Sequence, residues 1–177
     1  MYIYVIRHGQ TDWNVEHKLL SYTDIPLNDV GINQCKEAEK VVKNLDYNLV
    51  ISSPKLRTRQ TLEIVNSKNV EAIFDDRLIE RNAGNIEGVD VSTFDYQAWW
   101  TLGKDKYQDS ETIEECKTRV YDFLNEIKEK YKDKNILIVT HNGICRMIHS
   151  YFNGFPKNGR IFNTGFENAE IRIYEIK

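Results

Sequence analysis

The sequence predicts an α/β protein: a three-layer α/β/α sandwich around a mostly parallel sheet, with a short lid insertion. Wholly apolar runs at 2–6, 49–51 and 136–139 are typical of strands that are covered on both faces. Segments with apolar residues at helical spacing separate these runs, and strands that alternate with helices form parallel sheets. At 177 residues the chain is long enough to bury a proper core, so we expect a single domain over 1–177.

The first half of the chain alternates between strands and helices. A polar stretch follows the first strand, and Asn28 is the expected N-cap of the first long helix. The strand 49–51 ends at Ser53 and Pro54, residue types that cap a helix and occupy its first turn, so we expect a helix from there to about Asn66. Residues 70–74 are a third strand candidate. The helix after Asn28 carries apolar residues on one face at Ile32, Cys35, Ala38, Val42 and Leu45.

The second half begins with its least regular part. Residues 75–110 lack a clear period, and we expect a lid-like insertion at about 82–110. Thr112 and Glu115 predict a capping box at the start of a long amphipathic helix. After the strand 136–139 we expect a short helix closed by Gly154, and the alternation at 171–176 predicts a half-exposed edge strand.

Composition gives little support to several function classes. The net charge of −3 comes from 24 Lys and Arg against 27 Asp and Glu, without the basic surplus that binding to nucleic acid or an anionic membrane requires. The three cysteines are far apart and form no CxxC pair, which favours a reducing compartment. No signal peptide or membrane-spanning stretch is evident. We therefore expect a cytoplasmic monomer or homodimer with no nucleic-acid or membrane partner.

Chemically reactive residues follow three of the predicted strands. Arg7 and His8 end the first, Ser52 and Ser53 lead from the second to Arg57, and His141 ends the strand 136–139. If these strands are adjacent and parallel, two histidines and two arginines meet at one edge of the sheet. A guanidinium group binds two phosphate oxygens in a bidentate manner, and the N-termini of the following helices add backbone N–H donors. The implied ligand is a phosphate. Transfer of its phosphoryl group would also require an acid, for which the candidates are Asp75, Asp76, Glu80 and Glu87.

Five segments carry short motifs in a fixed order. They are Arg7-His8-Gly9-Gln10-Thr11 with Trp13-Asn14, then Asp-Ile-Pro-Leu-Asn-Asp-Val-Gly at 24–31, the Ser-Ser-Pro…Arg segment at 52–61, the acid segment at 78–88, and Val-Thr-His-Asn-Gly at 139–143. Together they resemble the motifs of the histidine phosphatase superfamily, the phosphoglycerate mutase-like proteins. One such match could arise by chance, but five in the family's order could not.

The resemblance implies a fold of the phosphoglycerate mutase type and a role for each matching residue. His8 would attack phosphorus and become a phosphohistidine. Arg7, Arg57 and His141 would hold the phosphoryl oxygens and stabilise their charge. Glu80 would protonate the departing alkoxide and then deprotonate the attacking water. This scheme needs no metal or other cofactor, because the arginines supply the positive charge.

Three further residues complete the expected phosphate site. Asn14 matches the family's asparagine that donates its side-chain amide to phosphate, and Asn142 opens the helix after His141. Ser21, with Leu20, stands where the family often has a Gln-Gly pair that touches the ligand. Leucine in place of an amide, and Ile86 where an aromatic residue is common, predict a less polar or differently arranged pocket mouth.

Three functions fit the motifs. The first is a phosphomonoesterase acting on a small phosphorylated metabolite. The second is a phosphoglycerate mutase, which the short spacing between Glu80 and His141 disfavours because mutases carry longer insertions there. The third is a catalytically silent binding module, which would not need Glu80.

The insertion leaves two interpretations open. The aromatic segment 94–100 either contacts substrate or only packs, and we expect at least one of its tryptophans to pack. Arg81, Lys104 and Lys106 either meet a charged substrate or lie on a solvated face, and the solvated face is the commoner explanation.

Overall fold

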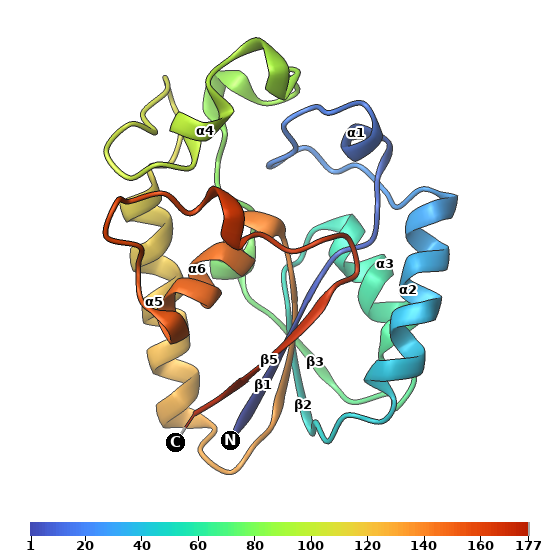
Figure 1. The fold of residues 1–177 in the computed structure, drawn as a ribbon. Helices are drawn as coiled ribbons and strands as arrows, with labels where there is room; N and C mark the ends of the chain where they lie inside the picture. Colours follow the sequence, from blue (N-terminus) through green and yellow to red (C-terminus); the bar gives the residue numbers. More distant parts are fainter. Residues whose placement is uncertain (177) are drawn as a thin grey trace.

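A computed structural model describes residues 1–176 and shows a mixed sheet with helices on both sides (Figure 1). The five strands are β1 (Tyr2–Arg7), β2 (Leu49–Ser52), β3 (Ala72–Phe74), β4 (Ile136–Thr140) and β5 (Ile171–Glu175). They are ordered β3-β2-β4-β1-β5. β1, β2, β3 and β4 run parallel, and β5 pairs antiparallel with β1 at one edge. The predicted α/β/α class with a mostly parallel sheet is confirmed.

The inner strands β1, β2 and β4 are mostly apolar because both faces of the sheet are covered there. Along β1, Tyr4 and Ile6 belong to the core beneath α2 and α3, whereas Ile3 and Val5 belong to the core beneath α5 and α6. Figure 1 shows these helix pairs on opposite sides of the sheet. The helices are α1 (Asp12–Val15), α2 (Asp29–Val42), α3 (Leu56–Val65), α4 (Tyr96–Trp99), α5 (Ile113–Lys130) and α6 (Asn142–Asn153), with 3₁₀ turns at Asp76–Leu78, Gly84–Ile86, Val91–Thr93 and Phe162–Thr164.

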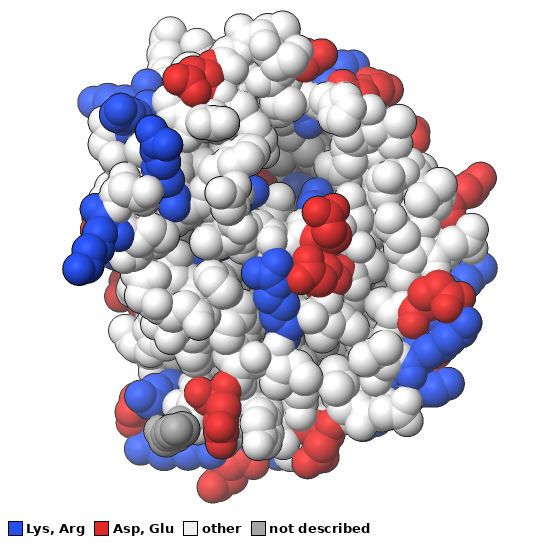
Figure 2. Space-filling view, in the orientation of Figure 1, with Lys and Arg blue, Asp and Glu red and all other residues white. Residues whose placement is uncertain are grey.

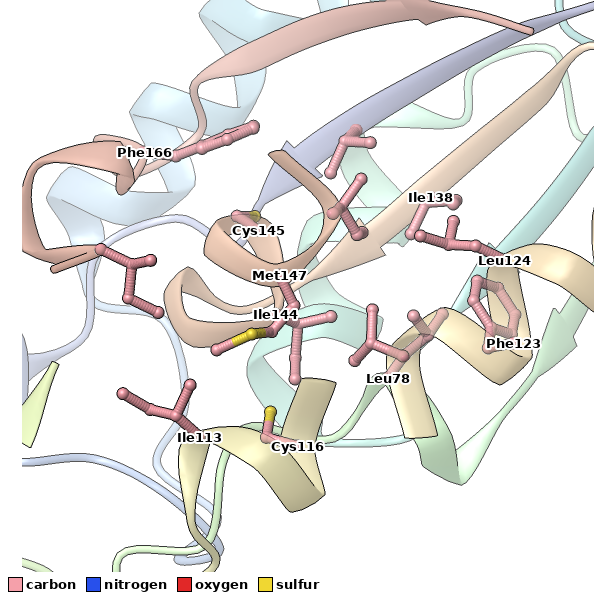
Figure 3. Packing of buried hydrophobic residues seen from close by; sticks show 14 of the residues in the cluster. Leu78, Ile113, Cys116, Phe123, Leu124, Ile138, Ile144, Cys145, Met147 and Phe166 are labelled. Atoms are coloured by element: carbon pink, nitrogen blue, oxygen red, sulfur yellow. The ribbon is translucent and has the colours of Figure 1, made fainter. Parts of the chain in front are cut away.

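The core on the α5 and α6 side is shown in Figure 3. Phe123 and Leu124 of α5 pack near Ile138 of β4, and Ile144 and Met147 of α6 lie within the same cluster. Each of these side chains is fully buried. This packing fixes α6 against the sheet, and with it the strand-to-helix turn that carries His141.

Most expected helix signals are confirmed. The Asn28 side chain accepts a hydrogen bond from the Gly31 N–H, Thr112 and Glu115 form the capping box of α5, and Gly154 follows α6 with a φ of 83°. The expected start of α3 at Ser53 and Pro54 is wrong. The helix begins at Leu56, because the Ser53 hydroxyl is hydrogen-bonded to His141 (2.8 Å) rather than serving as a cap.

The irregular segment that follows Glu80 lies over the carboxyl edge of the sheet, at the top of Figure 1. It contains two 3₁₀ turns and α4, and its two tryptophans, Trp99 and Trp100, are buried. Within residues 1–176, no helix combines the length and the hydropathy needed to cross a membrane.

Candidate active site

Strand register brings the two histidines together. Arg7 of β1 is the register partner of Thr140 of β4, so His8 and His141 are the next residues of two adjacent parallel strands. Their ring centroids are 5.3 Å apart, and both side chains are buried. β2 lies on the other side of β4 and delivers Ser53 to His141. The predicted convergence of these three strand ends is therefore present.

His8 is held as a neutral imidazole with one free ring nitrogen. Its Nδ1 lies 2.7 Å from the Gly9 carbonyl oxygen, which can only accept, so Nδ1 carries the proton and Nε2 keeps its lone pair. Burial lowers the pKa of His8 well below its usual range, and the charges of Arg57 and Arg7 lower it further. At neutral pH this side chain is a potential nucleophile.

His141 has the opposite tautomer. Arg57 donates its Nε–H to Nδ1 of His141 (3.2 Å), so the proton of the neutral ring is on Nε2, which faces the Ser53 hydroxyl oxygen at 2.8 Å. Burial lowers the pKa of His141, and the nearby Arg57 guanidinium adds to the effect. His141 is thus a neutral N–H donor next to a fixed cation.

Arg57 is fully buried at the start of α3. Besides His141, it donates to the backbone carbonyls of Thr23 (3.0 Å) and Ser21 (2.7 Å). Burial lowers the pKa of Arg57 to about 10, so the guanidinium remains charged at neutral pH. The loop at 21–23 thereby anchors the cation that polarises both histidines.

Arg7 supplies a second cation, which is partly buried and has an enclosed Nε. One Nη1–H donates to the Phe166 carbonyl oxygen (2.6 Å), while Nε has no partner among residues 1–176. A buried donor without a partner is costly unless a ligand accepts from it. Arg7 is therefore prepared to receive an anion.

Glu80 is held by two backbone donors. The Arg81 N–H donates to Oε1 (2.8 Å) and the Gly143 N–H, in the first turn of α6, donates to Oε2 (3.0 Å). The carboxyl group is largely buried, with 8% of the residue exposed. These contacts fix an acid–base group at the edge of the sheet where the histidines lie.

A cavity of about 70 Å³ unites these groups. Five predicted site residues line it: Arg7, His8, Asn14, Glu80 and Asn142. The other lining residues are Lys18, Leu19, Leu20, Arg81, Val91, Tyr96, Trp99 and Trp100. Figure 2 shows a hollow on this face, with basic atoms visible inside it. The aromatic segment therefore both packs and faces the cavity.

The remaining predicted site residues lie behind the lining. Arg57 and His141 contact each other beneath it, and the Ser21 side chain points elsewhere: its hydroxyl donates to the Arg81 carbonyl oxygen (2.8 Å) and accepts from the Ala83 N–H (3.1 Å). Leu20, rather than Ser21, faces the cavity. The expected direct contact of Ser21 with phosphate is replaced by a bracing role, in which its carbonyl holds Arg57.

Arg81 is wrongly expected on a solvated face. It is 1% exposed and forms a buried ion pair with Asp105. Lys104 and Lys106 are exposed, in agreement with the expected solvated face. The sequence around Arg81, which directly follows the buried Glu80, contains no signal that distinguishes a buried ion pair from a solvated side chain.

Asn168 is a site residue that the sequence did not reveal. Its Nδ2 donates to the His8 carbonyl oxygen (3.1 Å) and to Oδ1 of Asn14 (3.2 Å), and that oxygen also accepts from the Thr11 N–H. With its oxygen doubly engaged, Asn14 keeps its amide N–H groups for a ligand. Asn168 lies far along the chain from every motif, so no spacing pointed to it.

No group of three or more His, Cys, Asp and Glu side chains is arranged to hold a metal ion within the described residues. The three cysteines are free and buried.

Comparisons with known proteins match the geometry. The model of the histidine phosphatase superfamily (branch 1) matches residues 3–177. "Uncharacterized phosphatase PhoE" of Bacillus subtilis (strain 168) is 30% identical over 94% of this chain and 86% of its own. "Phosphoglycerate mutase-like protein 4" of Arabidopsis thaliana is 30% identical over 83% of this chain and 69% of its own.

Solved structures share the fold. Bacillus stearothermophilus YhfR superposes with a TM-score of 0.87 at 24% identity, covering 99% of this chain and 91% of that one. The α-ribazole phosphatase from Shigella flexneri has a TM-score of 0.86 at 23% identity, covering 100% of this chain and 91% of that one. With its ordered motifs, its strand-end histidines and a family match over nearly its whole length, the chain belongs to the histidine phosphatase superfamily.

Proposed function

We propose that the chain is a metal-independent phosphomonoester hydrolase that acts on a small phosphorylated metabolite through a phosphohistidine at His8. The observation that carries the proposal is a single cavity lined by a neutral imidazole, a partly buried arginine whose enclosed Nε–H has no partner among the described residues, and a buried carboxyl group. These are a nucleophile, an anion receptor and an acid–base group, the three parts that phosphoryl transfer requires.

The first half-reaction forms the intermediate. His8 Nε2 attacks phosphorus, and the P–O bond to the alcohol breaks with its electron pair moving to the departing oxygen. The protonated Glu80 transfers its proton to that oxygen and becomes a carboxylate. Arg7 offers its unpartnered Nε–H at the phosphoryl end of the site, where negative charge builds up on the equatorial oxygens, and Arg57 beside His141 adds positive charge from behind the lining.

The second half-reaction releases phosphate. The Glu80 carboxylate takes a proton from water as the water oxygen attacks phosphorus, and the P–N bond breaks with its electron pair returning to His8 Nε2. Inorganic phosphate leaves, and Glu80 is again protonated for the next turnover. Fixed arginine charge performs the electrostatic role that divalent cations perform in other phosphoryl-transfer enzymes.

The cavity wall supports hydrolysis of a weakly charged ester over mutase activity. Beyond the phosphoryl end, the lining is mostly apolar or aromatic: Leu19, Leu20, Val91, Tyr96, Trp99 and Trp100. Two cations also line this part of the wall, and both are already paired: Lys18 with Glu16 at 2.6 Å and Arg81 with Asp105 at 3.1 Å. A phosphoglycerate or bisphosphoglycerate carries further anionic groups, which would need unpaired cations in addition to Arg7, and neither Lys18 nor Arg81 is unpaired.

The test is phosphate release from a panel of small phosphomonoesters in the presence of a chelator. The wild-type protein should turn over, and His8→Asn should not. His17→Asn is the matched control, because His17 is exposed and Asn tolerates its φ of 53°. Acid-labile, alkali-stable phosphate on the quenched wild-type protein would identify the intermediate.

Two outcomes would contradict the proposal. Loss of turnover in chelator would remove the metal-independent mechanism. Conversion of 3-phosphoglycerate to 2-phosphoglycerate in the presence of 2,3-bisphosphoglycerate, faster than phosphate release, would establish the mutase instead.

A further inference from the structure

Arg81 joins the acid to the segment that covers the site. Its guanidinium makes four hydrogen bonds, all to this segment or its end: to the carbonyl oxygens of Glu111 (2.8 Å), Trp99 (2.6 Å) and Asp105 (3.0 Å), and to Oδ2 of Asp105 (3.1 Å). The guanidinium carbon also lies 3.4 Å from the centroid of the Trp99 ring. The Arg81 side chain thus binds the segment that covers the site at three of its residues, Trp99, Asp105 and Glu111.

The same residue contacts the acid through its backbone. The Arg81 N–H donates to Oε1 of Glu80 at 2.8 Å, so the peptide that carries the guanidinium also holds the carboxyl group. Trp100 closes the other side: a Cβ placed on Gly143 would lie 2.2 Å from Oε1 of Glu80 and 2.8 Å from Cη2 of Trp100. Glu80, Trp100 and the first turn of α6 therefore meet with no spare room.

The energetics indicate a purpose beyond stability. Arg81 and Asp105 have side chains that are 1% and 4% exposed, and a buried ion pair is at best weakly stabilising compared with apolar residues of similar volume. Such a pair fixes the geometry of the segments that carry it, because separating the two side chains would leave an unpaired charge in the low-dielectric interior. Asp105 extends this order by accepting from the Gly103 and Ile113 N–H groups.

We propose that Arg81 is a positioning residue, whose buried contacts with Asp105 and Trp99 fix the segment over the site and thereby hold the Glu80 carboxyl group where it meets the leaving oxygen. The inference rests on the proposed function, since it assigns Glu80 the proton transfer. It also assigns Arg81 no contact with substrate, because each of its three guanidinium nitrogens already donates within the protein.

The test compares leaving groups. An alkyl phosphate needs its departing alkoxide protonated, whereas p-nitrophenyl phosphate does not, and kcat/KM reports the half-reaction in which that proton moves. Arg81→Lys should lower kcat/KM for an n-alkyl phosphate about 10- to 100-fold, the range for a displaced acid, and for p-nitrophenyl phosphate less than about threefold. Asp105→Asn, which preserves shape and removes the charge, should show the same selectivity, and the double variant should lose little more than either single one.

Arg77→Lys is the matched control. Arg77 also pairs with a carboxylate, Asp75, and lies against an aromatic ring, Phe123, but it does not line the cavity. It should reduce neither substrate's kcat/KM appreciably. Thermal unfolding of each variant identifies changes that act only through stability.

Several results would overturn the proposal. Equal losses on both substrates, or no loss on either, would leave Arg81 without a positioning role. A selective loss on phosphomonoesters that carry a carboxylate would mean that Arg81 binds substrate directly. If neither Arg81→Lys nor Asp105→Asn folds, the pair serves global stability and the assignment falls. Failure of the proposed function looks different, since the wild-type protein itself would then release no phosphate.

Discussion

Gly143→Ala is expected to disable the acid while sparing the nucleophile. The added Cβ would lie 2.2 Å from Oε1 and 3.2 Å from Cδ of Glu80, and 2.8 Å from Cη2 of Trp100. Carbon and oxygen atoms pack comfortably only beyond about 3.4 Å, so the carboxyl group must retreat by about 1 Å. A displacement of that size in a catalytic group costs about 10²-fold in rate. The retreat also breaks the hydrogen bond from the Gly143 N–H to Oε2.

The fold should survive this change. Alanine is favoured over glycine in a helix by about 1 kcal/mol, which offsets part of the 1–3 kcal/mol that overpacking typically costs. The assay is kcat/KM for an n-alkyl phosphate and for p-nitrophenyl phosphate, with the unfolding midpoint in urea as the check on stability. We expect a loss of about 10²-fold on the alkyl ester and less than about fivefold on the aryl ester.

A cycle with Glu80→Gln makes the reasoning refutable. If the glycine acts through the carboxyl group, the double variant should be no slower on the alkyl ester than Glu80→Gln alone. Additive losses would show that Gly143 matters for another reason, such as the geometry of the first turn of α6. An unchanged rate would show that Glu80 need not occupy the position that the structure gives it.

The other predictions concern the buried cations, the histidines and the late-sequence support. Arg57→Met should lower kcat by about 10²- to 10³-fold, because it removes the buried charge beside His141. It should also reduce the free energy of unfolding by about 1–3 kcal/mol, because the carbonyl oxygens of Ser21 and Thr23 lose their donor. Steady-state kinetics measures the first loss and urea unfolding the second. The folded-state pKa values of His8 and His141 lie below their unfolded value near 6.5, so the unfolded chain binds more protons below that pH. The free energy of unfolding should therefore fall as the pH decreases from about 6.5, by up to about 1.4 kcal/mol per pH unit for each histidine. Urea unfolding at pH 7.5 and 5.5 tests this sign, and greater stability at the lower pH would contradict it. Asn168→Ala should raise KM for every substrate severalfold without changing leaving-group selectivity, because it frees the Asn14 amide to rotate; a selective loss on alkyl esters would place Asn168 in the proton transfer instead.

The fold could be predicted because its signals are local and periodic. Each interior strand is a short apolar run that ends at a change to polar residues, and the caps at Asn28 and Thr112 use side chains within three residues of their partners. The antiparallel direction of β5 and the short helix α1 could not be predicted, because neither strand direction nor a single helical turn leaves a distinct period.

The site was predictable where residues adjoin strand ends, and unpredictable where tertiary contacts decide. Ser53 has the composition of an N-cap, yet it is bonded to a histidine distant in the chain, and its helix starts later as a result. Ser21 and Leu20 are neighbours whose side chains point in different directions, so only the structure could tell which faces the cavity. For Arg81 a solvated face is the commoner expectation because charged residues are mostly exposed, and its burial depends on a partner, Asp105, that no local pattern reveals.

The two histidines also explain why Arg57 must be buried. A cation in water is screened and would shift the histidine pKa values little, whereas Arg57 inside the protein acts at low dielectric on both rings. Burial, and then the charge of Arg57, lower the pKa of His8 and so keep the ring unprotonated, as the proposed nucleophile requires. In the proposed mechanism the same charge attracts the phosphoryl group. Moving Arg57 to the surface would therefore weaken both effects together, so the cost of burying a guanidinium is tied directly to the reactivity of the imidazole.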